Sequence, residues 1–230
     1  SLADHYIAYR ALIRSKVACL KHEQGDEPSA DRARALLSLC DRRLERGRVR
    51  LVLIGGLPGT GKSTVAAGLS DLLGFSLLRS DEIRKDLTGT AHRPLTTEHA
   101  AFEAGIYDAA TTDRTYDELV RRAGRLLSGG ESVILDASWT NDAHRVLAAD
   151  IALATSSDLI ELRCDVASEV AVERIRRRRD AGVDASDADA EIARAMAGRA
   201  DPWPTAVTLD TTRELTHVLE KAVTIVAPNR

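Results

Sequence analysis

The chain has 230 residues, 44% of them hydrophobic and only 3% aromatic, which allows one large domain, or one domain with an appendage, around a mainly aliphatic core. The formal net charge of −3 gives no global reason to expect nucleic acid or an acidic membrane surface as a partner. Three scattered cysteines without C-x-x-C spacing argue against a disulfide framework, and the lack of an apolar run of membrane-spanning length or a signal segment leads us to expect a soluble cytoplasmic protein.

Residues 1–47 are expected to form a helical extension. Apolar residues recur at helical spacing from Tyr6 to Leu20, and the polar break at residues 25–28 precedes a second helix that should end at Gly47. Ser29 is the predicted N-cap of this second helix. The segment carries no catalytic motif, and its apolar stripe is typical of a helix face that packs against a partner. We therefore predict a boundary between residues 47 and 48.

A phosphate loop follows the predicted strand at residues 49–54. Residues 56–63 fit the pattern G-x-x-x-x-G-K-[ST] at every fixed position. The glycines allow backbone N–H groups to form a nest for the β-phosphate, and the helix expected at residues 62–73 directs its positive end at the same anion. Lys62 should reach the β- and γ-phosphate oxygens, and the Ser63 hydroxyl should bind Mg²⁺. The predicted ATP-binding residues are Gly56, Leu57, Pro58, Gly59, Thr60, Gly61, Lys62, Ser63 and Thr64.

Asp81 is the candidate general base. It follows a second short apolar strand, predicted at residues 75–78. In a parallel α/β sheet the loops at the carboxyl ends of the strands line the ligand crevice, so Asp81 should lie where an acceptor hydroxyl needs a base. The alternative is structural, because Ser80 or Asp81 could cap the helix that follows. The residues alone support both interpretations.

Residues 88–112 form the least regular stretch, and their length favours a functional or mobile segment over a plain connector. An amphipathic helix is then predicted from Thr115, and Gly129 with Gly130 should end it.

Asp136 ends an apolar strand predicted at residues 132–136. A carboxylate at this point of a phosphate-loop protein normally steadies Mg²⁺, directly or through water, although a strand-terminal Asp can also cap the next turn. Trp139 follows in another loop facing the crevice. Tryptophan more often belongs to the core than to a binding site, so Trp139 is only a candidate wall of an acceptor pocket.

An arginine-rich run is predicted as a helix over residues 170–182, after a helix at 142–155 and a strand at 158–164. Such a run is usually a solvated helix face, or a nucleic-acid patch in a basic domain. Arg174 and Arg178 share one helix face and could close together over the phosphates, where phosphoryl transfer needs additional cations.

The residues after this run complete the helix–turn–helix pattern that we expect of a lid. Residues 182–185 predict a flexible turn, and Ser186 should begin a second helical arm. A fifth strand is predicted at residues 207–210 and a closing helix at residues 214–225.

Four motifs, in this order and spacing, carry a family resemblance: Gly56-Leu-Pro-Gly-Thr-Gly-Lys-Ser63, Arg79-Ser-Asp-Glu-Ile-Arg84, Val133-Ile-Leu-Asp136, and Arg174-x-x-x-Arg178 with Ser186-Asp-Ala-Asp189. Together they resemble the small P-loop kinases of the AAA_33, zeta-toxin and polynucleotide-kinase-like group, which includes gluconate kinase. The resemblance covers about residues 48–225. It implies that Asp81 is the general base, Arg84 an acceptor- or phosphate-binding arginine, and Arg174 with Arg178 the lid arginines.

Residues 1–24 also resemble the last helices of an aminoglycoside-phosphotransferase-like domain, which precedes this kind of kinase module in some bacterial proteins. A preceding domain of that type is therefore an expected partner in a longer protein.

We accordingly expect an α/β P-loop kinase fold, with a mostly parallel five-stranded sheet flanked by helices, over residues 48–230, preceded by the helical extension. The expected activity is ATP- and Mg²⁺-dependent phosphorylation of a hydroxyl on a small molecule such as a sugar or an aminoglycoside. The alternatives are a kinase for 5′ nucleic-acid ends, a toxin-like kinase for nucleotide sugars, and a non-catalytic ATP-binding regulatory module.

Overall fold

The computed structural model describes residues 2–89, 109–181 and 196–228, without the side chains of residues 178–181. Its internal contacts divide the chain into two compact units, one of Ser1–Val49 with Ala227–Arg230 and one of Arg50–Val226. None of the helices in the described ranges is both long enough and apolar enough to span a membrane.

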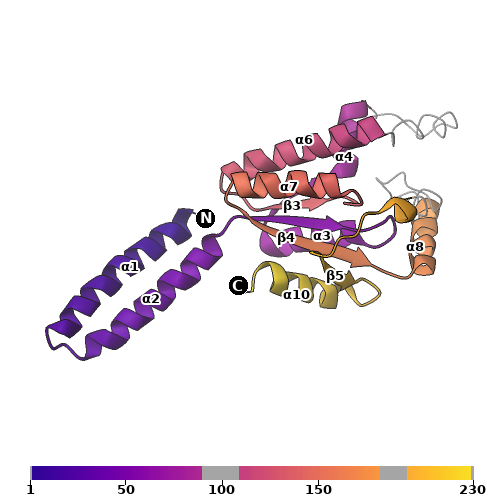
Figure 1. The fold of residues 1–230 in the computed structure, drawn as a ribbon. Coiled ribbons are helices and arrows are strands. Elements are labelled where there is room, and N and C mark those ends of the chain that lie inside the picture. The colour runs from indigo at the N-terminus through magenta and orange to yellow at the C-terminus, as the bar shows by residue number, and fades with distance from the viewer. Residues whose placement is uncertain (1, 90–108, 182–195, 229–230) are drawn as a thin grey trace. The chain divides into compact units, whose positions relative to one another are not determined.

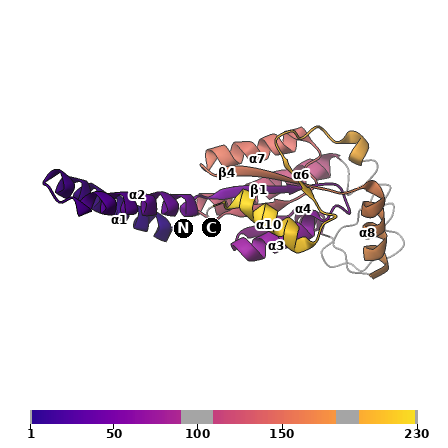
Figure 2. The ribbon, with the colours of Figure 1, turned by 90° about the horizontal axis from the view of Figure 1, so that it is seen from below.

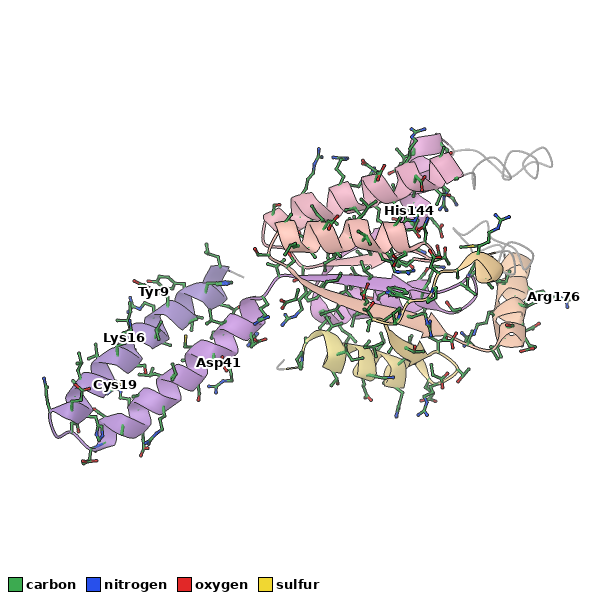
Figure 3. All side chains as sticks on the ribbon, in the orientation of Figure 1. Tyr9, Lys16, Cys19, Asp41, His144 and Arg176 are labelled. Carbon is green, nitrogen blue, oxygen red and sulfur yellow. The ribbon has the colours of Figure 1, made fainter. Side chains whose placement is uncertain are left out.

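The first unit is a helical hairpin of α1 (Leu2–Glu23) and α2 (Pro28–Gly47), which run antiparallel (Figure 1). Small side chains form the contact: Ala8 and Ala11 of α1 pack with Cys40 of α2. The Ser15 hydroxyl, also buried, donates to a backbone carbonyl of α2 at 2.9 Å. Most large apolar side chains of α1 are exposed, as Figure 3 shows for Tyr9. The hairpin therefore buries its small residues and exposes its large ones.

The predicted Ser29 cap is wrong. Pro28 takes the first position of α2, Glu27 is the N-cap residue, and the Ser29 hydroxyl instead donates to Asp26 Oδ2 at 2.6 Å. Proline suits the first helical position because its missing N–H would be unpaired there in any case. The predicted end of the helix at Gly47 is confirmed.

The second unit is an α/β fold. Its elements are β1 (Arg50–Gly55), α3 (Lys62–Leu73), β2 (Ser76–Arg79), α4 (Ser80–Thr88), α6 (Ala109–Ser128), β3 (Val133–Asp136), α7 (Asp142–Ala154), β4 (Asp158–Asp165), α8 (Ser168–Ala181), β5 (Val207–Asp210) and α10 (Leu215–Val226). All paired strands are parallel, in the order β2-β3-β1-β4-β5. The predicted parallel five-stranded sheet is confirmed.

Helices cover both faces of this sheet. Helices α6 and α7 lie on one face and α3 and α10 on the other, while α8 lies beyond the carboxyl ends of the strands (Figures 1 and 2). Every residue of the central strand β1 is buried. Because the parallel strands all end at one edge, the loops after β1, β2, β3 and β4 meet there.

Most predicted boundaries agree with the structure to within about one residue, but two local predictions in the second unit are wrong. Helix α6 begins at Ala109, six residues before Thr115. Strand β2 runs to Arg79, which becomes the N-cap residue of α4, so Ser80 and Asp81 lie inside the first turn and neither caps it. The remainder of the irregular stretch, residues 90–108, lies outside the described residues.

We predict that Leu53→Ala will lower the free energy of unfolding of the second unit by about 2–5 kcal/mol, because it leaves a cavity at a fully buried position of β1. Urea denaturation measures the change. Leu153→Ala is the matched control, since Leu153 is 81% exposed on α7 and its loss should change stability by less than about 0.5 kcal/mol. Equal effects of the two substitutions would contradict the assignment of β1 to the core.

Candidate functional site

The phosphate loop, residues 56–63, turns between β1 and α3 against the backbone of two other elements. Gly59 has a φ of +83°, and a Cβ atom there would lie 2.4 Å from the Ala171 carbonyl oxygen of α8. At Gly56, with a φ of +141°, a Cβ atom would lie 2.6 Å from the Cys164 carbonyl oxygen of β4. Both positions require glycine for backbone conformation and for space, so the loop is held against β4 and α8.

Helix α3 begins directly at the loop. Its N-cap is Gly61, in the left-handed conformation, which offers no side chain to the first N–H groups of the helix. Those groups carry the positive end of the helix dipole and favour an anion. Lys62 and Ser63 are half-buried in the first turn, and Thr64 is exposed. These N–H groups and side chains lie where the sequence predicts a bound phosphate.

Asp136 ends β3 beside the start of the loop. The sheet register pairs it with Ile54 of β1 on one side and with Arg79 of β2 on the other. The carboxylate is only 3% exposed, and its Oδ2 accepts a hydrogen bond from Arg79 Nε at 3.3 Å. Oδ1 is buried and has no hydrogen-bond partner among the described residues. A buried carboxylate oxygen left unpaired in this way suits a cation ligand.

Cys164 of β4 is buried near both Lys62 and Asp136. Burial raises the pKa of the Cys164 thiol to about 12, while the Lys62 ammonium lowers it and the Asp136 carboxylate raises it. Lys62 and Asp136 therefore both lie near Cys164, which belongs to the last residues of β4 at the carboxyl edge of the sheet. A protonated Cys164 thiol there acts as a small apolar wall.

Asp81 lies in the first turn of α4 and is paired with Arg84. Arg84 Nη1 donates to Asp81 Oδ1 at 3.0 Å, and the two side chains are 11% and 18% exposed, respectively. Asp81 follows the edge strand β2 by two residues, and Arg79 at the end of that strand contacts Asp136. Arg79 therefore links the two acidic candidates, because its side chain contacts Asp136 and Asp81 follows it by two residues.

Arg174 of α8 lies next to the phosphate loop. It donates to the Thr211 carbonyl oxygen at 2.7 Å and to the Thr211 hydroxyl at 3.3 Å. That hydroxyl in turn donates to the Thr60 carbonyl oxygen at 2.6 Å, so Thr211 ties the loop to α8. Arg176 projects outward from the same helix (Figure 3). The side chain of Arg178 and the predicted lid turn and second arm at residues 182–189 lie outside the described residues.

Trp139 is 1% exposed and has a φ of +54°, which is unusual for a bulky residue. Two contacts hold its backbone: its N–H donates to Tyr116 Oη at 3.1 Å, and its carbonyl oxygen accepts from Arg145 Nη1 at 2.7 Å. Trp139 lines a pocket beside the phosphate loop, whereas neither Arg84 nor Asp81 lines that pocket.

Tyr116 of α6 is the centre of a buried polar network. Its hydroxyl lies 3.0 Å from the Ser138 hydroxyl, and its ring stacks on His144 of α7 with centroids 3.9 Å apart and planes at 9°. His144 Nε2 lies 2.8 Å from Asp113 Oδ1. Burial raises the pKa of the Tyr116 hydroxyl, so it remains a protonated donor that also accepts the Trp139 N–H.

Sequence reasoning missed three residues that organise the site: Thr211, Tyr116 and Arg145. Thr211 directly follows the predicted fifth strand, so the rule that selected Asp81 and Asp136 at strand ends could have found it. Tyr116 was expected only as part of an apolar helix face. Nothing in the local pattern around Arg145 distinguishes it from an ordinary charged helix residue.

Comparison with known proteins agrees with this geometry. Residues 51–203 match the family model AAA_33, described as an AAA domain. Uncharacterized proteins of Mycobacterium tuberculosis and Mycobacterium bovis are each 40% identical to this chain over 212 residues, which is 92% of this chain. The chain spans 41% of the length of these curated relatives.

Three solved structures share the fold. A sugar kinase from Janibacter covers 78% of this chain and 96% of its own, at 20% identity and a TM-score of 0.58. The APS kinase of M. tuberculosis, in complex with AMPPNP and APS, covers 77% and 97%, at 19% identity and 0.56. A gluconokinase from Sinorhizobium meliloti covers 80% and 94%, at 18% identity and 0.53. The second unit therefore has a P-loop kinase fold.

We predict that Tyr116→Phe will lower the free energy of unfolding by about 1–3 kcal/mol, because it leaves the buried Trp139 N–H without its acceptor. Urea denaturation followed by tryptophan fluorescence measures the loss. Tyr9→Phe removes the same hydroxyl from an exposed position on α1 and serves as the control. If both variants are as stable as the unmodified chain, Tyr116 does not hold the Trp139 loop.

Proposed function

The chain belongs to the AAA_33 family of AAA domains, and we propose that it is a kinase that transfers the γ-phosphoryl group of ATP to a hydroxyl of a small molecule. One observation carries the proposal: a complete phosphate loop with Lys62 lies beside a buried Asp136 carboxylate that has one unpaired oxygen. A nest for phosphate next to a cation-binding carboxylate is the arrangement that binds a metal–nucleotide complex.

In this proposal the loop binds ATP through backbone N–H groups and the first turn of α3, and Lys62 adds a charge-assisted contact to the β- and γ-phosphates. The APS kinase that shares this fold is in complex with AMPPNP, which supports the binding of a nucleotide by this chain. Glycine at positions 56 and 59 lets the backbone approach both the protein wall and the phosphates.

Ser63 and Asp136 fit a Mg²⁺ ion that accompanies the nucleotide. Asp136 Oδ1 is buried and unpaired among the described residues, and Arg79 fixes the other oxygen. No group of three or more His, Cys, Asp or Glu side chains in the described ranges forms a metal cage. This agrees with Mg²⁺, which takes one or two protein ligands and completes its shell with phosphate oxygens and water. When bound, the ion would neutralise charge on the transferring group.

Asp81 would act as the general base. The acceptor oxygen forms a bond to the γ-phosphorus while the bond from that phosphorus to the bridging oxygen breaks, ADP leaves, and the hydroxyl proton passes to the Asp81 carboxylate. Arg84 holds Asp81 in place at 3.0 Å and would contact the acceptor or the phosphate. Arg174, already beside the loop, and Arg178 would stabilise the charge on the transferring group.

A small-molecule acceptor is favoured over nucleic acid. The chain carries a net charge of −3, and a nucleic-acid site needs a basic surface. Proteins that share the fold include a sugar kinase and a gluconokinase. We also infer that in longer proteins the hairpin follows a phosphotransferase-like domain, which the resemblance of residues 1–24 supports.

A regulatory ATP-binding module is the second candidate function. The specific observation in its favour is the Asp81–Arg84 ion pair, which occupies one carboxylate oxygen of the proposed base. Such a module would bind ATP through the same loop and phosphorylate nothing. The effect of changing Asp81 distinguishes the two functions.

We predict that Lys62→Ala will weaken Mg·ATP binding by roughly 1.5–3 kcal/mol, because it removes charge-assisted contacts to the phosphates. The rate of phosphoryl transfer should fall further. Isothermal titration calorimetry with ATP and Mg²⁺ measures the affinity. Lys16→Ala, on the exposed face of α1, is the control and should bind normally (Figure 3). Unchanged affinity and rate in Lys62→Ala would remove the basis of the proposed ATP site.

We predict that Asp81→Asn will slow phosphorylation by about 10²–10⁴-fold with little change in ATP affinity, because asparagine keeps the shape but cannot accept the proton. The assay begins with a screen of sugars, aminoglycosides, nucleosides and oligonucleotide ends against the unmodified protein. Asp150→Asn, on the exposed surface of α7, is the control.

Three other outcomes of the acceptor screen and the Asp81→Asn experiment have a definite meaning. A normal rate of Asp81→Asn with a good acceptor would show that Asp81 is not the base. If the screen finds no acceptor for the unmodified protein, the regulatory module becomes the better candidate. Weaker Mg²⁺-dependent ATP binding together with the rate loss would instead identify Asp81 as a metal ligand.

A further inference from the structure

A pocket of about 350 Å³ lies beside the phosphate loop, in the size range of small-molecule sites. Leu57 and Pro58 of the loop form one side, and Ile175 of α8 forms another. Trp139 and Trp203 contribute aromatic walls, and we call the cavity the two-tryptophan pocket. Because its loop side belongs to the predicted phosphate site, a molecule in this pocket would lie next to the transferring group.

One buried arginine contacts both aromatic walls of the two-tryptophan pocket. Arg145 is 4% exposed; it donates to the Trp139 carbonyl oxygen at 2.7 Å and to the Pro202 carbonyl oxygen at 2.8 Å. Its guanidinium carbon lies 5.4 Å from the centre of the Trp203 ring. Trp203 Nε1 is separately bound to Glu161 at 3.0 Å. Both aromatic walls are therefore held in place by contacts behind the pocket, and the cavity is preformed.

The charged groups that line the pocket are predominantly acidic. Among its described lining residues, Asp165 and Asp201 carry carboxylates, and Arg163 is the one cation. Arg163 donates to the Thr208 hydroxyl at 3.3 Å, and Asp201 Oδ2 accepts the Asp142 N–H at 2.9 Å. Asp165 is exposed at the end of β4. An anionic ligand would meet like charge here, whereas an amine or a neutral hydroxyl would find an acceptor.

We propose that the two-tryptophan pocket holds the body of the acceptor, and that the acceptor is a ring-bearing alcohol that is uncharged or carries an amine. The inference rests on the proposed kinase function, which it deepens by naming the substrate class. The apolar walls take the C–H faces of the ring, and the acidic side takes hydroxyl or ammonium donors. The hydroxyl that is phosphorylated lies toward Leu57 and Pro58, on the loop side of the pocket. Because Asp81 lies outside the pocket lining, this hydroxyl has to extend beyond that lining to reach the proposed base.

The test uses three sugars that share one ring and differ in charge: glucose is neutral, glucosamine carries an amine, and glucuronate carries a carboxylate. Calorimetric titration measures the binding of each to the full chain, with and without Mg·AMPPNP. We expect glucosamine to bind at least as tightly as glucose, and glucuronate about tenfold more weakly or worse, because its carboxylate would be desolvated against like charge. Bound AMPPNP should not be displaced, since the nucleotide and the ring occupy different parts of the site.

Two matched pairs of variants localise the binding. Val172→Trp fills the pocket from α8 and should abolish sugar binding, whereas Val170→Trp, at a position 38% exposed on the same helix and outside the pocket lining, should not. Asp165→Asn should reduce the preference for glucosamine over glucose by about tenfold, the scale of a charge-assisted hydrogen bond. Asp150→Asn on α7 is the control for that change.

The outcomes separate this inference from the proposed function. Failure of all three sugars to bind while AMPPNP binds would overturn the inference and leave the kinase proposal intact. Tighter binding of glucuronate than of glucosamine, or displacement of AMPPNP by the sugars, would also overturn it. Sugar binding that Val172→Trp abolishes, in a protein that does not bind AMPPNP, would support the pocket and reject the kinase.

Discussion

In the parallel register of β1, β2 and β3, Ile54 lies opposite Asp136, and Arg79 lies opposite Asp136 from the other side. This register decides where the chemistry of the second unit can be. It places the start of the phosphate loop, two residues after Ile54, beside the carboxylate that ends β3. It also brings Asp81, two residues after Arg79, to the same edge. A shift of one residue in either pairing would turn these side chains to the opposite face of the sheet.

At the same edge of the sheet the Asp136 carboxylate is buried, and its surroundings have to compensate for its charge. Asp136 is almost fully buried, yet only one of its oxygens has a partner, Arg79. Burial acts to lower the pKa of the Arg79 guanidinium, but the nearby Asp136 and Glu82 carboxylates outweigh it and raise that pKa, so Arg79 stays charged. Leaving the second oxygen unpaired costs stability in the protein alone, and a bound cation would remove that cost. The unpaired oxygen is therefore better explained by ligand binding than by folding.

Local sequence predicted the elements that depend on local rules. The phosphate loop, the strand ends and the helix that ends at Gly47 follow from glycine positions and apolar periodicity. Pro28 shows a local rule that was overlooked, since a proline at the first helical position already fixes Glu27 as the cap residue. Tyr116 and Arg145 could not be found in this way. Tyr116 binds Trp139 on the loop between β3 and α7, and Arg145 binds Pro202 in the segment before β5. Only the tertiary fold brings these partners together.

Trp139 connects the two halves of the proposed site. It lies three positions after Asp136. Its left-handed backbone, unfavourable for a tryptophan, is maintained by Tyr116 on one side and Arg145 on the other. A glycine would adopt this conformation more easily but would leave no wall for the pocket and no edge contact with the Tyr116 ring, whose centroid lies 5.1 Å away. The strain is thus balanced by contacts that also shape the cavity. Because the Asp136–Trp139 segment carries both the metal-binding candidate and the pocket wall, a change in its conformation would move the proposed phosphate site and the proposed acceptor pocket together.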